Sequence, residues 1–95
     1  MQTSIKRKPI ADLRTAIEMY YLNSELTTAD IKKLFNVSST TAKKYKDVIR
    51  DEMINREVLS NEINSVNTEI AYEVWGLNIS SLERRYTKLQ KFKSS

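Results

Sequence analysis

The sequence contains neither cysteine nor histidine, and these two absences remove several classes of site. Without cysteine the chain forms no disulfide and offers no thiolate to a metal ion. Without histidine it cannot build a zinc finger, a Ser-His catalytic triad or an imidazole general base. Capping or surface pairing explains the aspartates of the helical segments better than two-metal chemistry does. We therefore expect no enzyme activity, no metal, no cofactor and no small-molecule substrate.

Only one glycine and one proline occur among the 95 residues. So few turn-forming residues, with abundant Lys, Glu, Leu, Ala and Ile, favour an all-α fold over a β sandwich. No apolar run approaches the roughly 18 residues that a membrane helix needs. The N-terminal residues also lack the apolar core of a signal peptide. We therefore expect a cytoplasmic protein with no membrane contact.

Charge is distributed in three blocks along the chain. Residues 1–50 hold ten Lys/Arg against five Asp/Glu, residues 51–81 hold one against six, and residues 82–95 hold five against one. Two separated basic blocks suit contact with a polyphosphate. The alternative is that they are solvated helix faces and a solubilising tail.

Three helices are predicted in the N-terminal half. The first runs from Ile10 to Asn23, with Pro9 in its first turn and an apolar face of Ile10, Leu13, Ile17 and Tyr20. Thr27 and Asp30 form a capping box for a second helix over Thr28–Phe35. Asn36 suits the left-handed turn that ends it. Ser38 caps a third helix, whose inward residues are Ala42, Tyr45 and Ile49 and which extends past Met53 towards Leu59.

The C-terminal half predicts a connector and two more helices. Asn61–Asn67 is polar, and a short helix follows from Glu69 to Trp75, with Trp75 in the core. Gly76 suits the left-handed end of that helix. The last helix has Ser80 and Glu83 as a capping box and Leu82, Tyr86 and Leu89 as its apolar stripe. A shift of forty residues aligns parts of the two halves, but two independent helical hairpins are the favoured interpretation.

Ile31–Tyr45, IKKLFNVSSTTAKKY, resembles the helix-turn-helix of bacterial and phage DNA-binding proteins. The matching positions are Ile31, Val37, Ser38, Thr41 and Ala42. Lys32 replaces the usual alanine, and Asn36 replaces the usual glycine. With the first helix, the segment is similar to the three-helix form of repressors, recombinases, transposases and small terminase subunits. The resemblance implies three regions: a flexible basic arm (1–8), a helix-turn-helix unit (9–59), and a helical hairpin (60–95) for oligomerisation or a second DNA contact, possibly a degenerate second helix-turn-helix.

The candidate DNA-binding residues fall in three groups. With the apolar stripe of the third helix turned inward, its hydroxyls and basic side chains remain for bases and phosphates. The basic arm suits an adjacent minor groove, unless it is an ordinary flexible terminus. Basic residues of the last helix suit phosphate or an oligomer interface. The candidates are Ser38, Ser39, Thr40, Thr41, Lys43, Lys44, Lys46 and Arg50 in the third helix, Lys6, Arg7 and Lys8 in the arm, and Arg84, Arg85 and Lys88 in the last helix.

The leading hypothesis is sequence-specific binding of double-stranded DNA by a homodimer or higher homo-oligomer. The protein would be a transcriptional regulator or recombination accessory factor of a phage or mobile element. One alternative is a DNA-gripping structural subunit, such as a small terminase-like packaging protein. Another is a module whose basic face meets an acidic protein. Steep salt dependence of DNA binding separates the DNA hypotheses from the last one.

Overall fold

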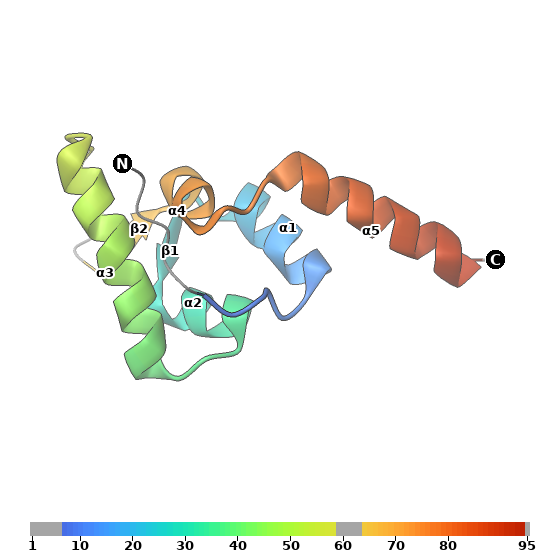
Figure 1. Ribbon diagram of the computed structural model, residues 1–95, viewed down its shortest axis with the longest axis horizontal. Helices are drawn as coiled ribbons and strands as arrows, with labels where there is room; N and C mark the ends of the chain where they lie inside the picture. The colour runs from blue at the N-terminus through green and yellow to red at the C-terminus, as the bar shows by residue number, and fades with distance from the viewer. Residues whose placement is uncertain (1–6, 59–63, 95) are drawn as a thin grey trace.

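The computed structural model describes residues 7–58 and 64–94, and in them the chain forms five helices and a two-stranded antiparallel sheet (Figure 1). The mostly helical fold is broadly consistent with the predicted all-α class, to which the structure adds a small sheet. The elements in chain order are α1 (Leu13–Leu22), β1 (Glu25–Thr27), α2 (Thr28–Phe35), α3 (Ser39–Asn55), β2 (Ser65–Asn67), α4 (Thr68–Trp75) and α5 (Ile79–Ser94).

The first helix begins later than the sequence predicts. The Asp12 carboxylate accepts a hydrogen bond from the Thr15 backbone N–H at 2.9 Å, which makes Asp12 the N-cap. Pro9 and Ile10 therefore precede α1 instead of forming its first turn. The cap sets the boundary because a carboxylate satisfies an amide that has no partner inside the helix.

Local signals fix both ends of α2 and the start of α3 as predicted. Thr27 and Asp30 form a capping box, and Asn36 ends α2 with a left-handed φ of 54°. Ser38 caps α3 by accepting from the Thr41 N–H. The helix ends at Asn55, short of the predicted extension towards residue 59.

The same layout returns forty residues later. Strand β2, helix α4, a left-handed turn at Gly76 and helix α5 repeat the order β1, α2, turn and α3. Asn67 caps α4, and the Asn78 side chain accepts from the Ser81 N–H at the start of α5. The predicted Asn61–Asn67 connector thus contains a strand, and Asn78, not Ser80, caps the last helix.

The sheet relates the two units by an approximate two-fold axis. Leu26 of β1 lies opposite Val66 of β2, its own equivalent forty residues later. Phe35 and Trp75 are also equivalent positions, and their rings are in contact. Both units therefore contribute to one core. The fully buried side chains (under 2% exposed) include Tyr72, Leu26, Ile31, Leu34, Ile49 and Val66.

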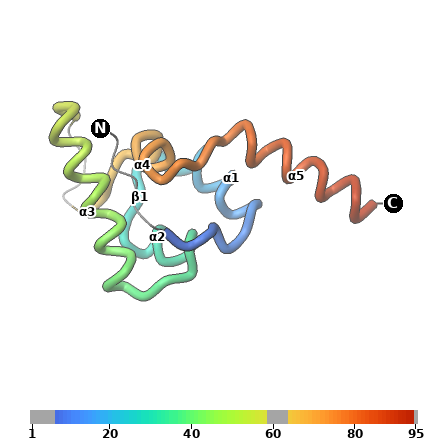
Figure 2. Tube along the Cα trace, in the orientation of Figure 1, coloured from blue at the N-terminus to red at the C-terminus, as the bar shows by residue number. Residues whose placement is uncertain are grey.

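The two units differ in the placement of their long helices. Helix α3 packs on α2 and also reaches β2 and α4. There, Arg56 forms a bidentate pair with Glu73, which lowers the pKa of that carboxyl. Helix α5 instead packs along α1 and extends away from the sheet, as the tube in Figure 2 shows. Helices α1 and α5 run antiparallel: Tyr21 near the end of α1 lies by Glu83 near the start of α5, and Asp12 before α1 lies by Lys93 near the end of α5.

Candidate nucleic-acid interface

Helix α3 is held firmly along one side. Ala42 and Ile49 are fully buried, and Met53 is 4% exposed. The Tyr45 ring meets Phe35 of α2 edge to face at 5.3 Å between centroids, so this residue joins the anchored side as predicted. The backbone of α3 is thereby fixed, and its remaining side chains lie at defined positions on the surface.

The N-terminal end of α3 presents a compact set of polar side chains. Ser39, Thr40, Lys43 and Lys44 are all exposed. Within the described part of the chain, neither lysine takes part in an ion pair or a side-chain hydrogen bond. Positions 40, 43 and 44 share one helix face, so this set can reach one external ligand together.

Ser38 and Thr41 have a structural role at the same end. The Ser38 hydroxyl accepts from the Thr41 N–H at 3.3 Å and also lies 3.2 Å from the Thr41 hydroxyl. Ser38 is exposed and Thr41 half-buried. Their first function is therefore to cap α3 and to hold Ser39 and Thr40 in place.

Lys46 corrects the predicted set, because it is 8% exposed and faces inward. Its ammonium donates to the Thr28 hydroxyl at 2.9 Å and to the Asn64 carbonyl at 3.4 Å. The spacing contained the signal, since Lys46 lies four residues after Ala42 and three before Ile49, on the inward stripe. Lys46 thus links α3 to both units and does not face outward.

The second half of the exposed α3 face is acidic. Asp47 and Asp51 are exposed and follow Lys43 and Lys44 on the same side of the helix. Arg50 lies beside them and is half-buried. The face therefore divides into a basic N-terminal half and an acidic C-terminal half.

Two residues of the predicted basic arm, Arg7 and Lys8, are described by the structure, and both contact the folded part of the chain. Arg7 donates from Nε to the Trp75 carbonyl, and its guanidinium lies 5.7 Å from the centre of the Phe35 ring. Burial lowers the pKa of Arg7. The backbone N–H of Lys8 donates to the Tyr45 hydroxyl, while its side chain is exposed. Arg7 is thus a structural residue that joins the two units, and Lys6 lies outside the described residues.

The basic candidates of the last helix lie apart from α3. Arg84, Arg85 and Lys88 are exposed on α5, and Arg84 donates to the Ser81 hydroxyl at 3.3 Å. Helices α3 and α5 occupy opposite ends of the molecule along its longest axis (Figure 1). The structure therefore does not bring the two basic groups into one site.

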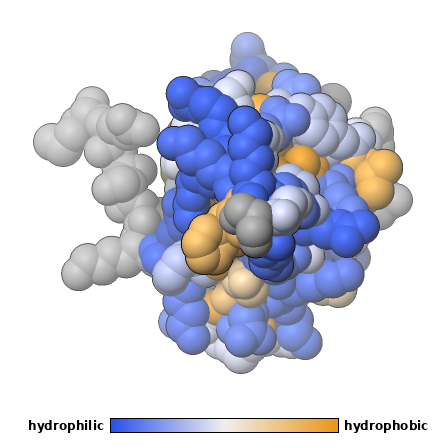
Figure 3. All heavy atoms as spheres, turned by 90° about the vertical axis from the view of Figure 1, so that its right-hand side faces the viewer, coloured by the Kyte–Doolittle hydropathy of each residue, from blue (hydrophilic) through white to orange (hydrophobic). Residues whose placement is uncertain are grey.

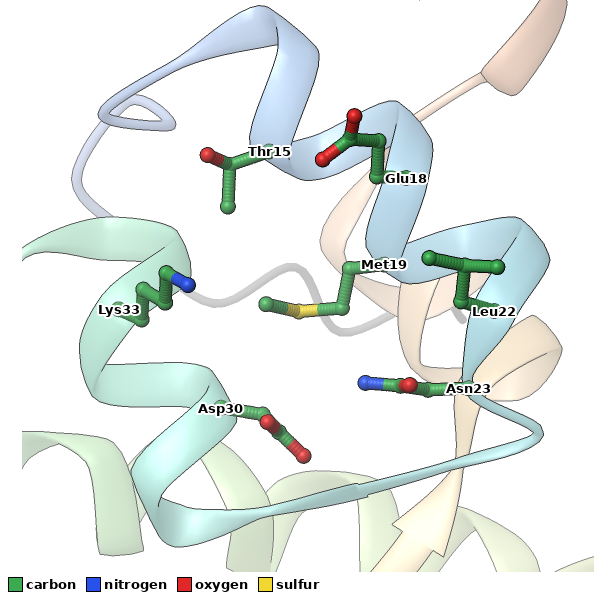
Figure 4. Close-up of a pocket in the computed structure, with 7 residues that line it drawn as sticks. All are labelled: Thr15, Glu18, Met19, Leu22, Asn23, Asp30 and Lys33. Carbon is green, nitrogen blue, oxygen red and sulfur yellow. The ribbon is translucent and has the colours of Figure 1, made fainter.

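A pocket lies between α1 and α2, and Figure 4 shows Met19 of α1 and Lys33 of α2 on opposite sides of it. Its volume of about 170 Å³ is smaller than the roughly 300–1,000 Å³ of small-molecule sites. The described residues contain no acidic cluster able to hold a metal ion. In that part of the chain, no helix combines the length and apolar character needed to cross a membrane. The basic end of α3 is therefore the candidate site.

Comparisons with models of protein families, with curated proteins and with solved structures found no match for this chain.

Proposed function

We propose that the protein binds double-stranded DNA through a helix-turn-helix formed by α2, the turn at Asn36–Ser38 and α3. One observation carries the proposal. The N-terminal end of α3 exposes two hydroxyls and two uncommitted lysines, while the opposite side of the helix is anchored in the core. A rigid helix with free donors at its N-terminal end can place them against base edges in the major groove.

The length and charge of each exposed side chain at residues 39–44 decide which part of the DNA we assign to it. The short hydroxyls of Ser39 and Thr40 require close approach, so we assign them to base edges at the groove floor. Lys43 and Lys44 reach further and bear charge, which suits guanine acceptors or backbone phosphates. The cap at Ser38 keeps the first turn in the helical form that this contact needs.

The acidic half of α3 limits how the helix enters the groove. Asp47 and Asp51 are exposed on the lysine side, and a phosphate beside them would be repelled. DNA contact is therefore confined to residues 39–44, with α3 inclined so that its C-terminal half leaves the duplex. This arrangement agrees with helix-turn-helix proteins in which the N-terminal residues of the second helix contact the bases.

The resemblance of Ile31–Tyr45 to bacterial and phage DNA-binding proteins suggests the biological role. We assign the chain as a small regulator or a recombination accessory factor of a phage or mobile element. A single module of this size buries roughly 600–1,000 Å² on DNA. Two copies on one site would double that contact, which favours binding as a dimer.

The test is DNA affinity as a function of salt for the variant Lys43→Ala/Lys44→Ala. Each lysine that neutralises a phosphate contributes about 0.9 to the slope of log K against log salt. We expect the slope to fall by about 1.8 on this basis, with unchanged helicity and melting temperature because both side chains are exposed. Fluorescence anisotropy on a random duplex measures the affinity, and selection from a random duplex pool identifies the preferred site.

The matched control is Lys91→Ala/Lys93→Ala, which removes the same charge near the C-terminal end of α5. If both variants lose equal affinity, the effect is net charge and α3 does not read DNA. Absence of measurable binding by the unaltered chain in low salt would overturn the proposal outright.

A further inference from the structure

Helix α5 occupies a position that the internal repeat does not explain. Its equivalent α3 packs into the core through Ala42, Lys46 and Ile49. On α5 the corresponding residues are Leu82, Tyr86 and Leu89, of which only Leu82 is buried. The helix leans on α1 at one side and leaves its other sides to solvent.

One exposed side of α5 is both apolar and basic. Leu89 is 37% and Phe92 is 78% exposed, and Arg85 and Lys88 lie beside them within one or two helical turns. Figure 3 views this end of the molecule and shows apolar atoms among strongly hydrophilic ones. We call Arg85, Lys88, Leu89 and Phe92 the α5 strip.

The C-terminal half of α3 bears the opposite charge around an apolar residue. Ile54 is 68% exposed, and Asp47 and Asp51 precede it at the spacing i−7 and i−3, on one helix face. Neither aspartate forms an ion pair within the described residues. We call Asp47, Asp51 and Ile54 the α3 strip.

We propose that the α5 strip of one copy binds the α3 strip of a second copy, and that two copies exchange this contact reciprocally. The chain is elongated, 47 × 26 × 26 Å, with the two strips at opposite ends of its long axis (Figure 1). A two-fold pairing of copies side by side in opposite directions would make both contacts at once. Such a reciprocal pair is closed, so association stops at the dimer instead of continuing into a filament.

Both halves of the contact are chemically complementary. Leu89 and Phe92 cover Ile54, which removes apolar surface from water on both partners. Arg85 and Lys88 approach Asp47 and Asp51, which selects this pairing over one between like strips. The basic end of α3 at residues 39–44 remains outside the contact, so the dimer would carry two copies of the proposed DNA-binding end.

Charge reversal followed by restoration tests the proposal, with mass in solution measured by light scattering at micromolar concentration. The unaltered chain should have twice the mass of one chain. Arg85→Glu/Lys88→Glu and Asp47→Lys/Asp51→Lys should each have the mass of one chain. An equimolar mixture of these two variants should regain the double mass, because each reversed strip then meets an opposite partner. Circular dichroism confirms that each variant folds.

The matched control is Lys32→Glu/Lys33→Glu, the same charge change at two exposed residues of α2, a helix that bears neither strip. It should remain a dimer. A single-chain mass for the unaltered protein, or a dimer that survives both reversals, would overturn the proposal. So would loss of DNA affinity in Arg85→Glu/Lys88→Glu with unchanged mass, because α5 would then bind nucleic acid instead of a second copy.

Discussion

The rings of Phe35 and Trp75 meet edge to face, with centroids 5.1 Å apart and planes at 90°. They are equivalent residues of the two units, separated by forty positions. Together with the pairing of Leu26 and Val66, this contact lies on the approximate two-fold axis. Because the axis runs through the core, each unit completes its apolar interior only against the other.

Tyr72 provides the first prediction, because it is 1% exposed and its hydroxyl donates to the Ala16 carbonyl at 2.6 Å. Tyr72→Phe removes this hydrogen bond, while the Ala16 carbonyl keeps its backbone bond within α1. We expect the free energy of unfolding to fall by about 1 kcal/mol, measured by urea denaturation. Tyr20→Phe is the control. Its ring packs on Tyr72 at the half-buried edge of the core, and its loss should be smaller.

The same hydroxyl predicts how stability depends on pH. Burial raises the pKa of Tyr72 above the value of about 10 that an unfolded tyrosine has. An acid whose pKa is higher in the folded state contributes stability below the unfolded value and loses it as pH rises beyond that value. The unaltered protein should therefore lose more stability than Tyr72→Phe between neutral and strongly alkaline pH. Parallel losses in the two proteins would contradict this assignment.

Thr28 and Thr68 are equivalent residues with opposite hydrogen-bonding states. The Thr28 hydroxyl accepts from Lys46, whereas the Thr68 hydroxyl is buried and has no partner among the described residues. Thr28→Val should destabilise the protein by about 1 kcal/mol, since the Lys46 ammonium then keeps only its longer bond to the Asn64 carbonyl. Thr68→Val should be neutral or stabilising in the same denaturation experiment. Equal effects would mean that Thr68 finds a partner in solution.

Sequence reasoning succeeded where the signal was local. Caps at Thr27 and Ser38 and left-handed turns at Asn36 and Gly76 each depend on neighbouring residues, and the structure has all four. The strands are only three residues long and pair across about forty positions, so hydrophobic periodicity cannot predict them. The sequence also does not predict the different positions of α3 and α5, because both helices bear an apolar stripe.

The candidate site was predictable in part for the same reason. Exposure of Ser39, Thr40, Lys43 and Lys44 follows from placing the apolar stripe of α3 inward. Arg7 and the Trp75 carbonyl are 68 positions apart in the sequence. The basic residues at the N-terminus therefore could not predict their hydrogen bond. The spacing of Lys46 from Ala42 and Ile49 could have predicted its burial. Lysine is usually exposed, however, so its residue type favoured the opposite prediction.

Asn36 and Gly76 provide the fourth prediction, because both end a helix with positive φ, 54° and 76°. Beyond Gly76 and its two chain neighbours, no heavy atom lies within 4 Å of a β-carbon built there, so a side chain meets only backbone strain. Gly76→Ala should therefore lower the free energy of unfolding by about 1–2 kcal/mol. Gly76→Asn should cost less, since asparagine tolerates this conformation at the equivalent position. Thermal denaturation of the two variants decides the order, and a larger loss for asparagine would contradict it.

Lys46 provides the last prediction, which distinguishes a buried lysine from a DNA-facing one on the same helix. Lys46→Met retains an unbranched apolar stem but removes the ammonium that bonds Thr28 and the Asn64 carbonyl. Stability should change by only about 1 kcal/mol, because methionine packs in the same space while the Thr28 hydroxyl and the Asn64 carbonyl lose this donor. DNA affinity and its salt slope should remain those of the unaltered chain. Lys43→Met, the matched exposed variant, should leave stability unchanged and lower the slope by about 0.9. If Lys46→Met lowers the slope as much as Lys43→Met does, α3 turns about its axis when it binds, and its anchored face is not the one seen here.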